Sequence, residues 1–302
     1  MSQAESWTIG RLLVWTTDFL KRHGADSPRL DAEVLLAHVR GCERIQLYTA
    51  YEEVASEESR AAFRELVKQR SQGTPVAYLV GRREFYSLSF RVTRDVLIPR
   101  PETEFVVMEV LDLIKSRVEG HRTEEPHAEE PVRIADVGTG SGAIAVSIAK
   151  HAPHARVLAI DISEPALDVA RVNIAEHQVA DRVELLHSDL LAAVPAEDRF
   201  DVIASNPPYV RECEIAELAR DVRDYEPHLA LVAGPTGMEI FQRLVGEAAR
   251  RLVSGGWLVM EIHPQLDQAL RELFQRDPGW SEVGIAKDLA GLPRVIKARW
   301  RP

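Results

Sequence analysis

The stretch FDVIASNPPY, residues 200–209, joins an apolar run to two consecutive prolines. Its apolar half predicts a buried strand. A residue that precedes a proline is pushed out of helical geometry toward an extended one, and Pro207 and Pro208 also carry no backbone N–H group. The strand is therefore expected to end in a stiff, extended tip instead of turning into a helix.

The tip expected after this strand presents hydrogen-bond acceptors and a flat ring. The acceptors are the side-chain oxygen of Asn206 and the carbonyl of Pro207, and Tyr209 supplies the ring. Such a tip suits a planar –NH2 group, whose two N–H bonds need two acceptors and whose face can stack. The candidate catalytic residues are Asn206, Pro207, Pro208 and Tyr209. The alternative is a strand that merely ends in a proline turn.

Strand and helix patterns alternate from residue 132 onward. Apolar runs predict strands at residues 132–137, 156–160, 183–186, 200–205 and 257–262. Helices are expected near residues 142–150, 163–177, 236–253 and 265–275. This alternation predicts an α/β fold with a mostly parallel sheet that is covered on both faces. Gly291 and Pro293 lie between apolar runs in residues 283–300, which predicts a terminal hairpin.

A glycine-rich loop, DVGTGSG at residues 136–142, follows the first of these strands and opens a helix. Glycines let the chain turn tightly and let the backbone approach a ligand. Their spacing also fits the dinucleotide fingerprint, so it leaves the cofactor open. A carboxylate at the position of Asp136 would repel a pyrophosphate but attract a cationic ammonium or sulfonium. The expected cofactor-binding residues of the loop are Asp136, Gly138, Thr139, Gly140, Ser141 and Gly142.

Two further carboxylates end strands of the same sheet. Asp161 ends the second strand, where a carboxylate can bind ribose hydroxyls of either cofactor. A helix cap is the alternative for Asp161 alone. Asp189 ends the third strand and could accept from an adenine amino group, with Leu190 beside the ring; a surface turn is the alternative. Asn206 completes the expected cofactor-binding set, because the ligand in such a sheet lies across the carboxyl ends of the strands.

Residues 1–73 have helical patterns that end near Gly24, Gly41 and Gly73. This region holds 10 basic and 11 acidic residues, so its net charge of −1 marks neither a nucleic-acid arm nor an acidic tail. Its residues allow a domain that holds a protein partner and, equally, a structural cap. Residues 74–98 predict a linker with a β-hairpin. An amphipathic helix is expected over residues 101–117, followed by a solvated loop at 119–131.

The whole chain has an ordinary globular composition, with 302 residues of which 45% are hydrophobic and 28% charged. This length allows two domains with cores of their own. No apolar run reaches membrane-spanning length, and the first residues lack a signal-peptide pattern. Cys42 and Cys213 make neither a zinc motif nor a disulfide framework, and they fit a cytoplasmic protein. The net charge of −10 argues against broad binding to a nucleic-acid backbone.

Taken together, the glycine loop, Asp161, Ser188-Asp189 and the Asn-Pro-Pro-Tyr tip resemble the motifs of class I S-adenosylmethionine-dependent methyltransferases. The tip resembles that of enzymes which methylate planar amide or amino nitrogens. Further motifs are similar to those of the HemK/PrmC family, the release factor glutamine methyltransferases. These are GTPVAYLVG at 73–81 with Glu84-Phe85, LIPRPETE at 97–104, the run 224–237 and KDLAG at 287–291 with Pro293-Arg294. The resemblance covers nearly the whole chain.

The resemblance implies a Rossmann-like methyltransferase domain at residues 99–302, after a helical substrate-docking domain at 1–73 and a linker with a β-hairpin at 74–98. It implies S-adenosylmethionine as the cofactor and no metal. The implied substrate is the glutamine of the Gly-Gly-Gln motif in class I peptide chain release factors. One departure is His263, which follows Glu261-Ile262 where the family usually has glycine. Loss of a glycine at such a turn could alter the backbone there.

Amide chemistry suggests how such a site would act. The lone pair of an amide nitrogen is delocalised into the carbonyl, so orientation and electrostatics are expected to matter most. We expect Asn206 and the Pro207 carbonyl to accept the two amide hydrogens, with Tyr209 packed on the amide plane. The main alternative is an amino methyltransferase for adenine or guanine, which would need a basic groove. A nicotinamide oxidoreductase rests on the glycine spacing alone, and a non-enzymatic binding protein leaves the site residues unexplained.

Overall fold

The computed structural model describes residues 6–120 and 131–302, so most of the loop expected at 119–131 lies outside the described residues. The chain divides into two compact units. The first comprises residues 1–82 together with 219–225, and the second comprises 83–218 and 226–302. The first unit thus extends past Gly73, where the sequence placed a domain boundary, and includes a segment from far along the chain.

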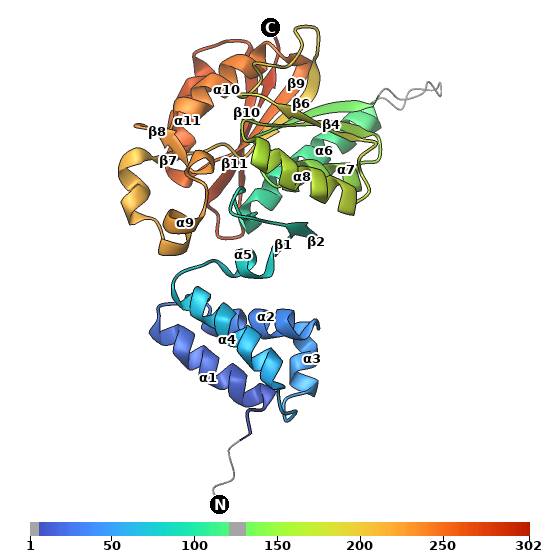
Figure 1. Cartoon of the computed structure of the whole chain (residues 1–302). Helices are drawn as coiled ribbons and strands as arrows, with labels where there is room; N and C mark the ends of the chain where they lie inside the picture. Colours follow the sequence, from blue (N-terminus) through green and yellow to red (C-terminus); the bar gives the residue numbers. More distant parts are fainter. Residues whose placement is uncertain (1–5, 121–130) are drawn as a thin grey trace, which may run out of the picture. The chain divides into compact units, whose positions relative to one another are not determined.

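The first unit is helical (Figure 1). Its helices are α1 (Ile9–Arg22), α2 (Pro28–Arg40), α3 (Arg44–Thr49), α4 (Glu57–Ser71), α5 (Val76–Val80) and α9 (Arg220–Tyr225). Local chemistry sets several ends: Thr8 caps α1 with its side chain, Ser56 does so for α4, and Gly41 ends α2 in left-handed geometry. Apolar side chains of α1, α2 and α4 form one core, which includes Leu13, Leu36 and Phe63. The sequence pattern did not indicate α3, a single short helix.

The segment with α9 contacts the first unit although it follows the strand of the Asn-Pro-Pro-Tyr tip in sequence. The Tyr225 hydroxyl donates to the backbone carbonyl of Gln72 over 3.2 Å. Arg70 lies 3.9 Å from the carboxylate of Asp221, and it also pairs with Asp31 at 2.7 Å. The chain therefore returns to the helical unit between the tip and the last strands of the second unit.

The second unit is built on a seven-stranded sheet in the order β10-β11-β9-β6-β3-β4-β5 (Figure 1). The strands are β3 (Val132–Val137), β4 (Ala155–Asp161), β5 (Val183–His187), β6 (Phe200–Ser205), β9 (Leu252–Glu261), β10 (Trp280–Lys287) and β11 (Pro293–Trp300). Strands β9, β6, β3, β4 and β5 pair in parallel, whereas β11 is antiparallel to both neighbours. The predicted Rossmann-like sheet with a terminal antiparallel hairpin is confirmed.

Helices cover both faces of this sheet. Helices α6 (Glu104–Gly120), α7 (Ala143–His151) and α8 (Glu164–Glu176) pack on one face, and α10 (Glu239–Ala249) and α11 (Asp267–Gln275) pack on the other. Successive strand residues point to opposite faces, so Ile134 belongs to the first core and Ala135 to the second. Every residue of β6 is buried, as a central parallel strand requires.

The order of the strands places two loops side by side. The chain proceeds outward from β3 through β4 to β5, and then crosses to β6 on the other side of β3. Val137 and Ser205 are register partners at the ends of β3 and β6. The glycine loop and the Asn206 tip therefore begin next to each other, at the switch point where ligands bind in open parallel sheets.

Two small sheets complete the second unit. The hairpin of β1 (Arg82–Phe85) and β2 (Leu88–Arg91) fulfils the hairpin expected after Gly73, and its turn holds Tyr86 and Ser87 at positive φ. Strands β7 (Val210–Arg211) and β8 (Val232–Gly234) pair in parallel after the tip. The sequence pattern did not indicate this second pair.

Candidate active site

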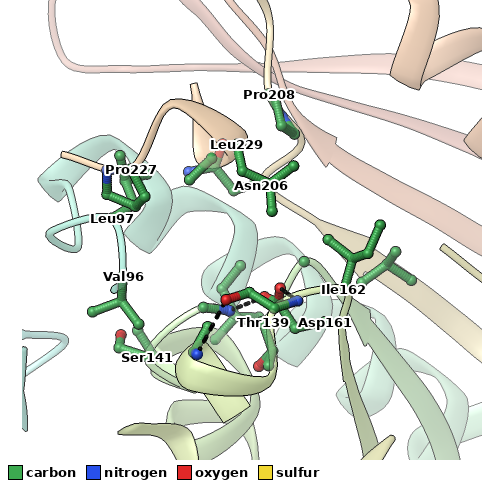
Figure 2. Close-up of a pocket in the computed structure, with 18 of the residues that line it drawn as sticks. Val96, Leu97, Thr139, Ser141, Asp161, Ile162, Asn206, Pro208, Pro227 and Leu229 are labelled. Atoms are coloured by element: carbon green, nitrogen blue, oxygen red, sulfur yellow. Dashed lines mark hydrogen bonds between the residues drawn. The ribbon is translucent and has the colours of Figure 1, made fainter. Parts of the chain in front are cut away.

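A cavity of about 280 Å³ opens at the carboxyl ends of the parallel strands (Figure 2). Its lining comes from the glycine loop, from the ends of β4, β5 and β6, and from segments around residues 95–103 and 227–230. Of the residues predicted for the site, those that line the cavity are Gly138, Thr139, Gly140, Ser141, Asp161, Asp189, Leu190, Asn206 and Pro208. The fold thus brings most of the expected cofactor residues, with Asn206 and Pro208 of the tip, into one cavity, whereas Asp136 and Gly142 are not part of its lining.

The glycine loop is held tightly between the strands. The N–H groups of Gly138 and Thr139 both donate to the carbonyl of Ile160, over 2.8 and 2.9 Å. Gly142 has a φ of +80°, a left-handed backbone conformation that favours glycine. The side chain of Asn173 on α8, which sequence reasoning missed, donates to the Ser141 carbonyl over 2.7 Å.

Asp136 lies beneath this loop and is fully buried. Its Oδ2 accepts from the Thr139 hydroxyl over 2.6 Å and from the N–H of Ala145 over 3.0 Å, whereas its Oδ1 has no hydrogen-bond partner among the residues that the structure describes. Burial raises the pKa of Asp136 to about 7, against the lowering effect of those two hydrogen bonds. Asp136 therefore joins the loop to the start of α7 and retains one buried oxygen that could accept.

Asp161 shapes the loop from the next strand. Its Oδ2 accepts from the N–H of Gly140 over 2.8 Å and its Oδ1 accepts from the N–H of Ser163 over 2.9 Å. Burial raises its pKa, although these N–H groups oppose the shift. The side-chain cap of α8 is Ser163 and not Asp161. Asp161 thus borders the cavity while its carboxylate fixes the loop opposite.

Asp189 and Leu190 lie at the end of the cavity formed by β5. Asp189 pairs with Arg243 of α10 at 2.8 Å, and both side chains are about half exposed. Leu190 adopts a positive φ of 48°, which is uncommon for a residue with a branched side chain. The adjacent Ser188 hydroxyl accepts from the N–H of Ala193 over 2.9 Å and closes the turn. The pairing with Arg243 was not foreseen from the sequence.

Asn206 is tied to residues from two other elements. Its Nδ2 donates to the hydroxyl of Thr103 over 3.0 Å, and that hydroxyl donates to Oε2 of Glu261 over 2.5 Å. Thr103 ends the 3₁₀ turn Pro101–Thr103, and Glu261 ends β9. Both are buried, with 4% and 3% exposure. Thr103 and Glu261 belong to motifs noted in the sequence, but their roles could not be predicted from it. The hydrogen bonds that define those roles join residues more than 100 positions apart.

Tyr209 packs behind the tip. Neither Tyr209 nor Pro207 lines the cavity among the described residues. The Tyr209 ring contacts the core on the α10 and α11 face and lies 6.0 Å from the ring of His263. Burial, with a further contribution from Glu261, raises the pKa of its phenol to about 12. The phenol is therefore protonated throughout the physiological range.

His263 occupies an ordinary extended conformation, with φ −72° and ψ 137°. Such angles do not require glycine, so the departure from the family pattern leaves the turn after β9 intact. Its Nδ1 accepts from the N–H of Gln265 over 3.4 Å. Burial lowers the pKa of His263, so the ring is neutral near pH 7.

Another buried carboxylate, that of Glu226, stabilises the wall of the cavity. Glu226 accepts from the N–H of Ile98 over 3.3 Å and pairs with Arg100. It is 4% exposed. This contact joins the LIPRPETE motif to the segment that contributes Pro227 and Leu229 to the lining. Two of the quoted motifs, LIPRPETE and the run 224–237, therefore meet at one cavity wall.

Two other classes of site were sought within residues 6–120 and 131–302. This part of the chain has no cluster of three or more His, Cys, Asp or Glu side chains that could hold a metal ion. It also has no helix that is long and apolar enough to cross a membrane.

Two protein families match parts of the chain. The family described as "PrmC N-terminal domain" matches residues 11–81, and the one described as "Methyltransferase small domain" matches residues 124–222. The first match lies in the helical unit, and the second includes the glycine loop and the Asn206 tip.

Curated relatives match along almost their full length. "Release factor glutamine methyltransferase" from Rhodopirellula baltica is 50% identical over 290 residues, which are 96% of this chain and 95% of that protein. The protein of the same name from Chlorobaculum tepidum is 41% identical over 300 residues, 98% of each chain. The one from Koribacter versatilis is 40% identical over 273 residues, 90% of this chain and 91% of that protein.

Among solved structures, the hMettl16 catalytic domain in complex with MAT2A 3'UTR hairpin 6 superposes with a TM-score of 0.56. The match covers 78% of this chain and 82% of that chain at 17% sequence identity. A likeness at this level of identity concerns the fold alone.

Proposed function

The chain belongs to the family of release factor glutamine methyltransferases, and from that premise we propose what it does. It transfers a methyl group from S-adenosylmethionine to the side-chain amide nitrogen of a glutamine in class I peptide chain release factors. The glutamine is that of the Gly-Gly-Gln motif. The observation that carries the proposal is the juxtaposition of the glycine loop and the Asn206 tip in one cavity.

The residues around the cavity fit S-adenosylmethionine. When bound, this cofactor supplies an electrophilic methyl group on a positively charged sulfur. In its ionised form, Asp136 would present Oδ1 as an acceptor beneath the glycine loop, where a nearby cationic group would be stabilised and would in turn favour ionisation. Asp161 would hold the ribose from the end of β4, and Asp189 with Leu190 would hold the adenine from the end of β5. Pro208 and Asn206 bound the cavity on the side where substrate would enter.

The tip orients the amide nitrogen. Because the amide lone pair is delocalised into the carbonyl, the site has to position the nitrogen and twist it rather than deprotonate it first. The Oδ1 of Asn206 accepts one amide hydrogen, and the carbonyl of Pro207, which follows Asn206 but is not part of the cavity lining, accepts the other. These two bonds fix the amide plane, so that the nitrogen lone pair, perpendicular to that plane, faces the methyl group. Tyr209 supports the tip from behind with a protonated phenol. The new N–C bond forms as the bond between the methyl carbon and the sulfonium sulfur breaks, and the positive nitrogen then loses its proton to water.

The helical unit contributes to docking of the release factor. It holds a groove of about 420 Å³ lined by Trp15, Phe19, Arg64 and Lys68 among others. The rings of Trp15 and Phe19 stack at a centroid distance of 5.0 Å, and Trp15 is 47% exposed. This combination of exposed aromatic and basic side chains suits a partner segment that is apolar and acidic. The proposal places the enzyme in the cytoplasm, where translation terminates, with protein and not nucleic acid as substrate.

Mass spectrometry of the methylated product tests the proposed function. Purified chain is incubated with S-adenosylmethionine and a class I release factor, and peptides from the factor are sequenced. We expect one added methyl group on the glutamine of Gly-Gly-Gln. A factor with Gly-Gly-Glu in its place is the control and should stay unmodified. Methylation of an adenine-containing oligonucleotide, with none on the factor, would contradict the proposal and favour the nucleic-acid alternative.

A further inference from the structure

Asn206 donates to Thr103 and Thr103 donates to Glu261, so each hydrogen bond of this chain has its donor on the Asn206 side. An ionised carboxylate can only accept hydrogen bonds, so the Thr103 hydroxyl must donate to Glu261. The same hydroxyl oxygen then has lone pairs free and accepts from Asn206. Only the Nδ2 end of the Asn206 amide can fill that position, as observed over 3.0 Å. The Oδ1 end is therefore turned away from Thr103.

This direction matters for amide recognition. An asparagine amide has a donor end and an acceptor end of nearly equal shape, and without a fixed neighbour it could present either. A substrate –NH2 group needs the acceptor end. Building on the proposed function, we propose that Thr103 and Glu261 are positioning residues, which hold Asn206 with Oδ1 toward the substrate amide. Neither residue is proposed to contact the transferred methyl group.

Burial of the hydrogen-bonded residues stabilises the orientation of the Asn206 amide. Thr103, Glu261 and Ser205 just before Asn206 are all at most 4% exposed, so water cannot readily replace any member of the chain. The main chain after Glu261 is also fixed, because the N–H of Ile262 donates to the carbonyl of Arg294 over 2.8 Å. The three residues come from three elements of one packed unit, which gives the amide little freedom to turn over.

Protonation of Glu261 would reverse the chain. A protonated carboxyl can donate to Thr103, whose hydroxyl could then donate to Asn206 and favour the flipped amide. The charged and titratable groups that face Glu261 are Glu102, Arg100, Arg294 and Tyr209. Burial, and to a smaller extent Glu102, raise the pKa of Glu261 to about 7, while the Thr103 hydrogen bond and the two arginines oppose the shift. The orientation that accepts from substrate is thus favoured as pH rises through about 7.

Two substitutions of Thr103 separate positioning from packing. Thr103→Val keeps the shape and removes the hydroxyl, whereas Thr103→Ser keeps the hydroxyl and removes the methyl group. Methylation of a release factor is measured at saturating S-adenosylmethionine, and cofactor binding is measured separately by calorimetry. We expect Thr103→Val to lower kcat by ~10-fold or more, with KM for the factor little changed, and Thr103→Ser to stay near wild type. The double variant Thr103→Val, Asn206→Ala should be no slower than Asn206→Ala alone.

The pH profile tests the role of Glu261. Wild-type kcat should rise between pH 6 and pH 8, and Glu261→Gln should lose this rise because glutamine does not titrate. The side-chain NH2 signals of Asn206 in a ¹⁵N NMR spectrum, assigned by their loss in Asn206→Ala, should shift with the same midpoint. That shift should be absent in Glu261→Gln. The NMR measurement needs no substrate, so it tests the orientation independently of turnover.

Several outcomes would overturn the proposal. They are a Thr103→Val enzyme as active as wild type, a Thr103→Ser enzyme as slow as Thr103→Val, and a double variant much slower than Asn206→Ala. An acid-side loss of kcat that persists in Glu261→Gln, or Asn206 signals that do not shift with pH, would also contradict it. Failure of the proposed function would show differently, since wild-type enzyme would then add no methyl group to the release factor under any of these conditions.

Discussion

At the scale of single residues, the side-chain amide of Asn206 has two hydrogen-bonding roles, one for each end. Its Nδ2 donates a hydrogen bond to the hydroxyl of Thr103 over 3.0 Å, and its Oδ1 is the end proposed to accept from the substrate amide. A side chain with one donor end and one acceptor end is needed there. Aspartate, which ionised has two acceptor ends, matches only half of that requirement.

Substitutions of Asn206 should show both requirements. We predict that Asn206→Ala lowers turnover by ~10²-fold, comparable to the loss of one preorganised polar contact, and leaves S-adenosylmethionine affinity within a few fold. Asn206→Asp should be as slow as Asn206→Ala, because its carboxylate would face the Thr103 oxygen without a hydrogen to donate. Steady-state kinetics with a release factor and calorimetry with the cofactor provide the measurements. Asp turnover well above that of Ala would mean that only the acceptor matters.

At the scale of elements, the passage from β3 through the glycine loop into α7 depends on one buried carboxylate. Asp136 binds Thr139 of the loop and the N–H of Ala145 in α7. Burial favours its protonated form, and the pKa of about 7 lies well above the ordinary value of 3.8. The same group therefore links the shape of the loop to the stability of the unit.

The free energy of unfolding without cofactor should fall as pH rises from the ordinary pKa of Asp136, 3.8, to its folded value of about 7. In the unfolded chain Asp136 loses its proton near its ordinary pKa, while in the folded chain it keeps it until about pH 7. The contribution is fully present below the unfolded pKa and is lost as pH rises through the folded one. We predict that Asp136→Asn makes the decline in unfolding free energy between pH 5 and pH 7 shallower, by up to ~1.4 kcal/mol per pH unit.

Urea unfolding at several pH values checks this prediction. Asp168→Asn is a matched control, because the Asp168 side chain is 73% exposed on α8, and it should leave the pH dependence unchanged. Glu261 is present in all three proteins, so its own titration cancels in the comparison. Parallel curves for wild type and Asp136→Asn would show that Asp136 titrates normally in the folded chain.

At the scale of the whole molecule, the proposal divides recognition between the two units. The helical unit would bind the body of the release factor, and the cavity of the second unit would bind its glutamine. A short Gly-Gly-Gln peptide should then depend on the cavity alone. Whole factor should depend on both units.

Surface variants of the full chain test that division. We predict that Trp15→Ala and Lys68→Glu raise KM for whole release factor by ~10-fold, the loss expected for an interface hot spot. Their kcat/KM for the short peptide should match wild type. Ile45→Ala is the control, because Ile45 is 66% exposed in the same unit and does not line the groove among the described residues. Equal losses on peptide and whole factor would argue against docking at this groove.

The fold class and nine residues of the cavity could be predicted before any tertiary contact was known. Alternating buried strands and helices leave few options besides a parallel sheet covered on both faces. The ends of β3, β4, β5 and β6 could be read directly, because residues that end neighbouring parallel strands meet at one edge. For this reason Gly138, Asp161, Asp189 and Asn206 were predicted together, and they line one cavity.

The contacts that hold these residues in place depend on the packing of segments that are distant in sequence. Thr103 lies 103 positions before Asn206 in the sequence. Glu261 lies 158 positions after Thr103. No local pattern records such contacts, because they arise when three elements pack and exclude water. The same holds for Arg243 beside Asp189, and for the short segment at 219–225 that joins the helical unit. Local sequence sets which groups a strand end presents; packing sets which end of an amide faces the substrate.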